Sequence, residues 1–175
     1  GGDMNVDVKK GLAEVQKEIT QAQSDVIKII TRQKVVMAWG VGKIINEHLS
    51  RNDKTGYGEK LIEQLAQDTS LADKVLYKMR SFYQAYPNLP KNDDRLNWTH
   101  YQMLSGVKKD EERKYFEDLT KQNNWDVIAL QEEATKSKNG KGKFAKNNKK
   151  VTTKKLYPVR GKLFSYPITK LNNGE

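Results

Sequence analysis

The sequence predicts a mainly α-helical protein, with a long N-terminal helix and a helix-turn-helix-like bundle followed by a basic linker and a short C-terminal β-hairpin. Three observations support this fold class. Apolar residues recur at steps of three and four through residues 5–135, as in amphipathic helices. Lysine, glycine and asparagine dominate residues 136–155, a composition that predicts a flexible linker. Aromatic and β-branched residues flank an Arg-Gly pair within residues 156–175, which indicates a hairpin or the start of a further domain.

Composition excludes several classes of protein. The chain of 175 residues has no cysteine and two histidines, which argues against disulfides, thiolate zinc sites and cysteine nucleophiles. The longest apolar run, 35–42, is too short to span a membrane, and the N-terminus lacks the pattern of a signal peptide. Nucleotide-binding and hydrolase motifs are also missing, so we expect no cofactor. We therefore expect a soluble, cytoplasmic protein that is not itself an enzyme.

The first predicted helix covers residues 7–50 as one helix or two in line. Six of its apolar residues form a heptad seam, here called the arm seam: Leu12, Val15, Ile19, Ala22, Val26 and Ile29. The seam fits either a dimerising coiled coil, or a docking surface for a nuclease partner, or a helix packed against later helices of its own chain. The last interpretation is favoured, because polar Gln33 ends the seam before three heptads. Gly40 and Gly42 predict close helix approach or a kink near Trp39.

Two shorter helices follow, over 59–68 and 71–86, separated by Thr69-Ser70. Pro87 ends the second helix, whose apolar side includes Met79 and Phe82. Its other side carries cationic and hydrogen-bonding groups, namely Lys74, Tyr77, Lys78, Arg80, Ser81 and Gln84. Helix, short turn and basic-faced helix are the pattern of a helix-turn-helix, in which such a face enters the major groove of DNA. An ordinary amphipathic surface helix would give the same pattern.

Three more helices are predicted over 98–105, 111–122 and 125–134, with Asn97 and Asp110 as N-caps of the first two. Trp39, Trp98 and Trp125 are predicted core residues, and His100 is predicted to be packed or to cap its helix. Lys108 and Lys109, just before a helix, are candidates for contact with a phosphate or form a solvated pair.

The net charge of +10 is confined to the C-terminal part of the chain. Residues 136–175 hold 12 of the 32 basic side chains but one of the 22 acids, which leaves 20 and 21 for residues 1–135. A lysine-rich segment binds polyanions by releasing counterions from phosphates, although it reads no sequence. The candidate phosphate-binding residues are Lys136, Lys138, Lys141, Lys143, Lys146, Lys149, Lys150, Lys154, Lys155 and Arg160. A solubilising linker is the alternative.

Five segments occur in an order that resembles a known family. They are Trp39-Gly40-Val41-Gly42-Lys43, Gly56-Tyr57-Gly58-Glu59-Lys60-Leu61-Ile62, Leu76-Tyr77-Lys78-Met79-Arg80-Ser81-Phe82-Tyr83, Leu96-Asn97-Trp98-Thr99-His100-Tyr101, and Arg113 with Tyr115-Phe116 and Asn124-Trp125-Asp126-Val127. Together they resemble the N-terminal helical domain of the YhcG-like family of bacterial proteins related to PD-(D/E)XK nucleases. The resemblance implies a helix-turn-helix-like module that binds DNA and is attached to a nuclease domain. Ala72 and Val75 depart from the family's Ser and Asn, and nothing beyond 135 resembles the nuclease domain.

The sequence itself argues against a nuclease site in this chain. Glu112-Arg113-Lys114 matches the (D/E)XK part of the nuclease motif in residue type and spacing. It lies in a predicted helix, however, and no strand before it carries the partner aspartate that a metal site needs. The preferred hypothesis is a double-stranded DNA-binding module that targets a nuclease-related bacterial system. The alternatives are a protein-interaction module that dimerises or docks a catalytic partner, and an RNA-binding component that uses Tyr157, Phe164 and Tyr166 for stacking.

Overall fold

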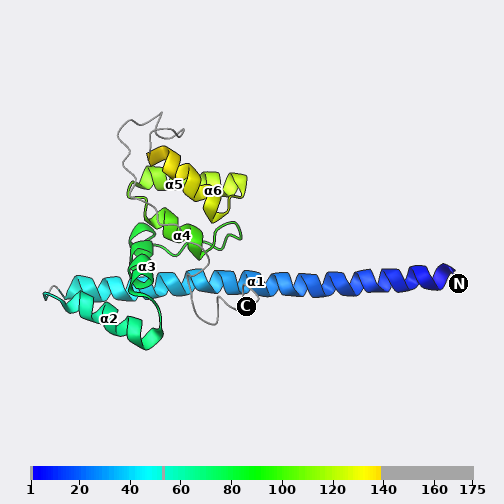
Figure 1. Ribbon diagram of the computed structural model, residues 1–175, viewed down its shortest axis with the longest axis horizontal. Helices are drawn as coiled ribbons and strands as arrows, with labels where there is room; N and C mark the ends of the chain where they lie inside the picture. The colour runs from blue at the N-terminus through cyan, green and yellow to red at the C-terminus, as the bar shows by residue number, and fades with distance from the viewer. Residues whose placement is uncertain (1, 53, 139–175) are drawn as a thin grey trace.

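The computed structural model describes residues 2–52 and 54–138, which form helices α1 to α6 (Figure 1). The mainly helical fold class is confirmed for this part of the chain. The predicted hairpin and the linker beyond Lys138 lie outside the described residues. The last helix continues to Lys138, past the domain boundary predicted at 135, and Ser137 is buried there.

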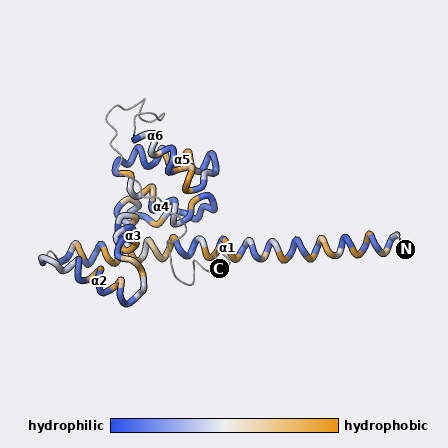
Figure 2. Tube along the Cα trace, in the orientation of Figure 1, coloured by the Kyte–Doolittle hydropathy of each residue, from blue (hydrophilic) through white to orange (hydrophobic). Residues whose placement is uncertain are grey.

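Helix α1 (Gly2–Arg51) is a single helix whose N-terminal part projects away from all the others (Figure 1). We call residues 2–29 the arm. Hydrophobic turns recur along the arm between hydrophilic ones (Figure 2). Its seam side chains are exposed, with Ile19 at 53% and Ile29 at 62% of their full surface. The favoured interpretation of the arm seam was therefore wrong for the described part of the chain: the seam does not pack against any of the helices α2 to α6.

The other part of α1 packs against the body through Val35, Ala38, Gly42 and Ile45, all buried. Helix α2 (Tyr57–Thr69) and helix α3 (Asp73–Ala85) follow it, joined by a short turn in which Ser70 adopts a left-handed conformation (φ 58°). Gly42 lies directly on the backbone of α3 at Met79. Close helix approach, one of the two predictions for this glycine pair, is thus confirmed at Gly42, and α1 continues through it without a break.

Three short helices form the other side of the body: α4 (Trp98–Ser105), α5 (Asp110–Asn123) and α6 (Val127–Lys138). The two sides meet at an aromatic cluster. The rings of Phe82 and Tyr101 stack with their centroids 4.9 Å apart, and the centroids of the Phe82 and Trp98 rings are 5.4 Å apart. Trp98 is fully buried as predicted, whereas Trp39 and Trp125 are half-buried at the edge of the core. Helix α3 therefore lies between α1 and α4, with one side left for solvent.

The predicted caps have different outcomes. Asn97 caps α4 in a capping box, in which its side chain accepts the His100 amide at 3.0 Å. The His100 ring Nδ1 accepts the Asn97 amide at 3.1 Å, and Nε2 lies 2.8 Å from the Trp125 carbonyl, so His100 is both packed and capping. Asp110 does not cap α5, because the helix already includes it and its carboxylate pairs with Arg113 at 2.7 Å.

Candidate nucleic-acid interface

The solvent side of α3 carries four of the predicted DNA-binding residues. Lys74 and Tyr77 are exposed, and Lys78 and Ser81 are half-buried. At about 100° per residue these four side chains occupy one stripe, opposite the buried Met79. We call Lys74, Tyr77, Lys78 and Ser81 the α3 strip. Asp73, in the first turn, is the one acid on this helix.

The two positive charges of the α3 strip, Lys74 and Lys78, lie one helical turn apart in the first half of α3. Burial lowers the pKa of Lys78, and the nearby Lys74 ammonium lowers it further. A phosphate oxygen beside Lys78 would offset both this repulsion and the loss of water.

The other two residues predicted for this face are held at the edge of α3 by α1. Arg80 Nε donates to Asn46 Oδ1 at 3.1 Å, and Gln84 Nε2 donates to the same oxygen at 3.0 Å. Arg80 is half-buried, while Gln84 stays exposed. The shared acceptor fixes both side chains beside the α3 strip rather than at its centre. Sequence reasoning missed Asn46, which is distant in the chain and has no charge.

Arg113 connects the loop of Lys108 and Lys109 to the end of α3. Its guanidinium donates to the carbonyl of Val107 at 2.9 Å and to that of Ala85, the last residue of α3, at 3.4 Å. Lys108 and Lys109 are exposed in this loop. The structure thus brings this lysine pair near the C-terminal end of α3, whereas Lys74 lies near its N-terminal end.

The basic residues predicted in the C-terminal segment are mostly beyond the described part of the chain. Lys136 and Lys138 are exposed in the last turn of α6, and Lys136 pairs with Glu133 at 3.7 Å. Lys141, Lys143, Lys146, Lys149, Lys150, Lys154, Lys155 and Arg160 lie outside the described residues. Their role in binding phosphate stays a prediction.

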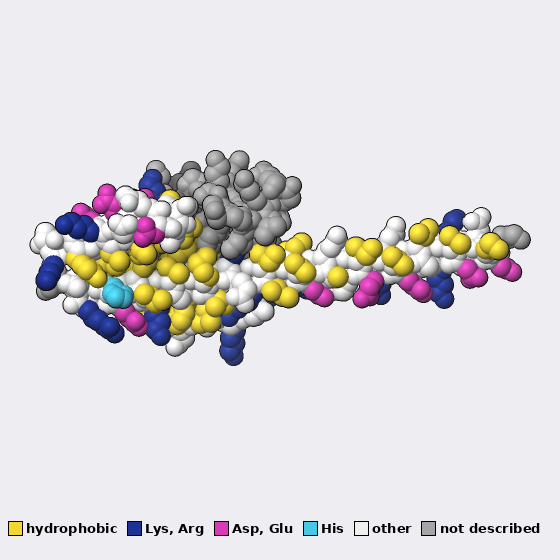
Figure 3. Space-filling view, turned by 90° about the horizontal axis from the view of Figure 1, so that it is seen from below, with side chains coloured by type: hydrophobic (Ala, Val, Ile, Leu, Met, Phe, Trp, Pro, Cys, Tyr) yellow, Lys and Arg dark blue, Asp and Glu magenta, His cyan; other side chains and the backbone are white. Residues whose placement is uncertain are grey.

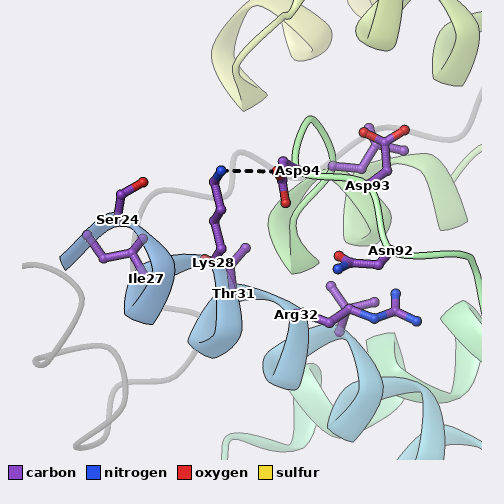
Figure 4. Close-up of a pocket in the computed structure, with 10 residues that line it drawn as sticks. Ser24, Ile27, Lys28, Thr31, Arg32, Asn92, Asp93 and Asp94 are labelled. Carbon is purple, nitrogen blue, oxygen red and sulfur yellow. Dashed lines mark ion pairs between the residues drawn. The ribbon is translucent and has the colours of Figure 1, made fainter. Parts of the chain in front are cut away.

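A hollow of 240 Å³ lies between α1 and the loop before α4 (Figure 4), and none of the residues that line it belongs to α3. Lys28 and Asp94 form an ion pair of 3.5 Å at its rim. Asp93 pairs with Arg95 at 2.8 Å, and this hydrogen bond lowers the pKa of Asp93 to about 2. Because both carboxylates already have cationic partners, the hollow has no pair of groups poised for acid–base chemistry.

The nuclease-like pattern Glu112-Arg113-Lys114 lies in α5, and the acidic residues at this place differ in their exposure to solvent. Glu112 is fully buried, and burial raises the pKa of its carboxyl group. Glu111 is exposed in the same helical turn. Within residues 2–52 and 54–138, no group of three or more metal-ligating side chains lies together. None of the described helices is long and apolar enough to cross a membrane.

A family model matches the part of the sequence that forms these helices. The DUF1016 N-terminal domain matches residues 14–139, most of the chain and nearly all of its described part. The chain belongs to the DUF1016 N-terminal domain family. The match is consistent with the YhcG-like resemblance found in the sequence, and its limits include α2 to α6 and all of α1 except the first residues. Comparisons with curated proteins and with solved structures gave no match.

Proposed function

We propose that this DUF1016 N-terminal domain binds double-stranded DNA through the α3 strip, as the targeting part of a nuclease-related bacterial system. The observation that supports the proposal most is the geometry of α2, the turn and α3. A short turn containing left-handed Ser70 joins two helices, and the second packs on α1 with a cationic stripe facing away. Two helices joined by a short turn, with the second exposing a cationic side, are also found in helix-turn-helix proteins, where the second helix enters the major groove.

Each group of the strip has a role in this proposal. Lys74 and Lys78 would neutralise phosphates, and Tyr77 and Ser81 would donate hydrogen bonds to phosphate or to base edges. The Asn46 amide holds Arg80 and Gln84 beside them, so that these two side chains would reach the same groove from its edge. Lys108 and Lys109 would meet the backbone near the other end of α3.

The C-terminal lysines would add affinity that does not depend on DNA sequence. Replacing five of them with glutamine (K141Q/K143Q/K146Q/K149Q/K150Q) should weaken binding to all duplexes equally and flatten its salt dependence. An RNA-binding role, the alternative based on Tyr157, Phe164 and Tyr166, would instead give preference for single strands. Competition among duplex DNA, single-stranded DNA and RNA separates the two.

The decisive experiment reverses the charge of the strip. The variant K74E/K78E should bind a labelled duplex at least about tenfold more weakly at low salt, with the slope of log K against log salt reduced by about 0.9 for each lost phosphate contact. Fluorescence anisotropy on the full chain at several salt concentrations measures both quantities.

The matched control is K10E/K17E, which makes the same change of charge at two exposed positions on the arm. It should retain most of the affinity, because the arm is remote from α3 in the fold (Figure 1). Circular dichroism must show unchanged helicity in both variants. Equal binding by the parent and K74E/K78E, or equal loss in both charge-reversal variants, would reject the α3 strip as the DNA-binding surface.

A further inference from the structure

The arm carries an apolar surface that nothing in its own described chain covers. Its seam positions are more than half exposed at Leu12 (57%), Val15 (59%) and Val26 (54%). Hydrophobic side chains follow one edge of the arm and acidic side chains the other (Figure 3). At about 1.5 Å per residue, residues 2–29 extend roughly 40 Å. Most helices in proteins are stabilised by packing of their apolar face, and the β-branched residues of the arm lower its intrinsic helix propensity.

The arm seam points away from the body. Ala22 of the seam and Ala38, which is buried against the body, are separated by 16 residues, or about 160° around the helix axis. The same offset separates Val26 from Gly42. The seam therefore cannot fold back onto the chain's own core. A second helix lying along it would also not collide with that core.

On the body-facing side, the arm is mainly polar, with Lys10, Lys17 and Thr20 exposed there. Val6 and Ile27 are the large apolar residues on this side, and Ile27 borders the hollow beside the loop before α4. The apolar stripe thus changes sides between residues 29 and 35, as expected of a helix with two different partners. The heptad steps of the seam continue through exposed Gln33 and half-buried Val36. A polar residue at one such position fixes the register of a coiled coil.

We propose that the arm pairs with the arm of a second copy of this chain, as a parallel, in-register, two-stranded coiled coil. Charges decide the orientation. In a parallel pair, Glu18 of one copy lies beside Gln23 of the other, with no like charges opposed. In an antiparallel pair that matches Leu12 with Ile29, Glu18 lies beside Asp25, and the two carboxylates repel. The two bodies then lie on opposite outer sides of the paired arms.

The first experiment measures mass by sedimentation of the full chain at several concentrations. The parent should sediment as a dimer of about 40 kDa, twice the mass of the chain (20.1 kDa). The variant I19D/V26D should raise the dissociation constant at least about 100-fold, because it places four carboxylates in the seam of a dimer. The control K17D/S24D introduces the same side chains on the polar side of the same heptads and should remain dimeric. A monomeric parent, a trimer, or equal behaviour of the two variants would overturn the proposal.

A second experiment tests orientation and does not depend on how the charged variant folds. The chain has no cysteine, so Ile29→Cys introduces a single thiol. In a parallel, in-register pair the two thiols meet and oxidise to a covalent dimer, whereas Ser24→Cys on the other side does not. Cross-linking between Leu12→Cys and Ile29→Cys chains, with none between two Ile29→Cys chains, would show an antiparallel pair and overturn the proposed orientation. The inference stands independently of DNA binding.

Discussion

Gly42 of α1 lies against the main-chain carbonyl of Met79 in α3, so closely that a Cβ atom at position 42 would overlap that oxygen. The contact joins the two helices that position the α3 strip. A backbone carbonyl cannot rotate away as a side chain can, so the helices themselves would have to separate. This glycine therefore sets the distance between α1 and α3.

Gly42→Ala should destabilise the fold by about 1–3 kcal/mol or more, the usual cost of overpacking a tight contact. Gly40→Ala is the matched control, because no atom lies within 4 Å of the position its Cβ would take. It should be neutral or stabilise by up to about 1 kcal/mol, since alanine is the better helix former. Chemical unfolding followed by circular dichroism measures both. Equal stability of the two variants would contradict the role given to Gly42.

Burial raises the pKa of Glu112, which makes its contribution to stability depend on pH. A carboxyl group whose pKa is higher in the folded state favours folding while it is protonated, and this contribution is lost as pH rises above its unfolded pKa. Glu112→Gln should therefore stabilise the protein by about 1–3 kcal/mol at neutral pH and by little below the unfolded pKa. Unfolding curves across this pH range test the expectation, with exposed Glu111→Gln as the control. A stability gain independent of pH would contradict it.

His100 gives stability the opposite dependence on pH. The Asn97 amide can only donate to Nδ1, so the folded ring is neutral and Nε2–H donates to the Trp125 carbonyl. Burial lowers the pKa of His100 below 6.5, and the stability it contributes is lost as pH falls from there. His100→Gln keeps a capping-box acceptor without a titrating group. It should cost about 1 kcal/mol at pH 7.5 and remove most of the loss of stability as pH falls below 6.5.

The periodicity of the sequence was sufficient to predict where the helices lie, but not to predict which surface packs against each apolar side. Asn97, Pro87 and the Thr69-Ser70 break gave helix boundaries within a few residues, because caps and breakers act locally. The arm seam was assigned to the chain's own core, because a heptad pattern reports which side is apolar and not whose surface meets it. The arm seam and the buried residues of α1 lie about 160° apart around the helix axis. This angle follows from the spacing of the residues alone, so the sequence could have predicted that the seam faces away from the core.

The candidate site was harder to predict, because it depends on contacts between distant segments. The pattern of α3 identified its solvent side but could not separate the α3 strip from Arg80 and Gln84, which Asn46 holds at the edge. Asp110 was expected to cap α5 and instead pairs with Arg113, whose guanidinium also reaches the carbonyl of Ala85. Such interactions leave no trace in local periodicity.

The arm and the α3 strip make a joint prediction if both proposals hold. A parallel dimer carries two α3 strips, so each binding event would engage about twice as many phosphates as a monomer. The seam variant I19D/V26D should then bind DNA with about half the salt slope of the parent, while its α3 strip is intact. K74E/K78E should lose affinity for DNA yet sediment as a dimer. Anisotropy titrations and sedimentation of the same samples measure both properties. Loss of dimerisation in K74E/K78E would contradict the separation of the two surfaces, and an unchanged salt slope in a monomeric I19D/V26D would show that one α3 strip carries all the binding.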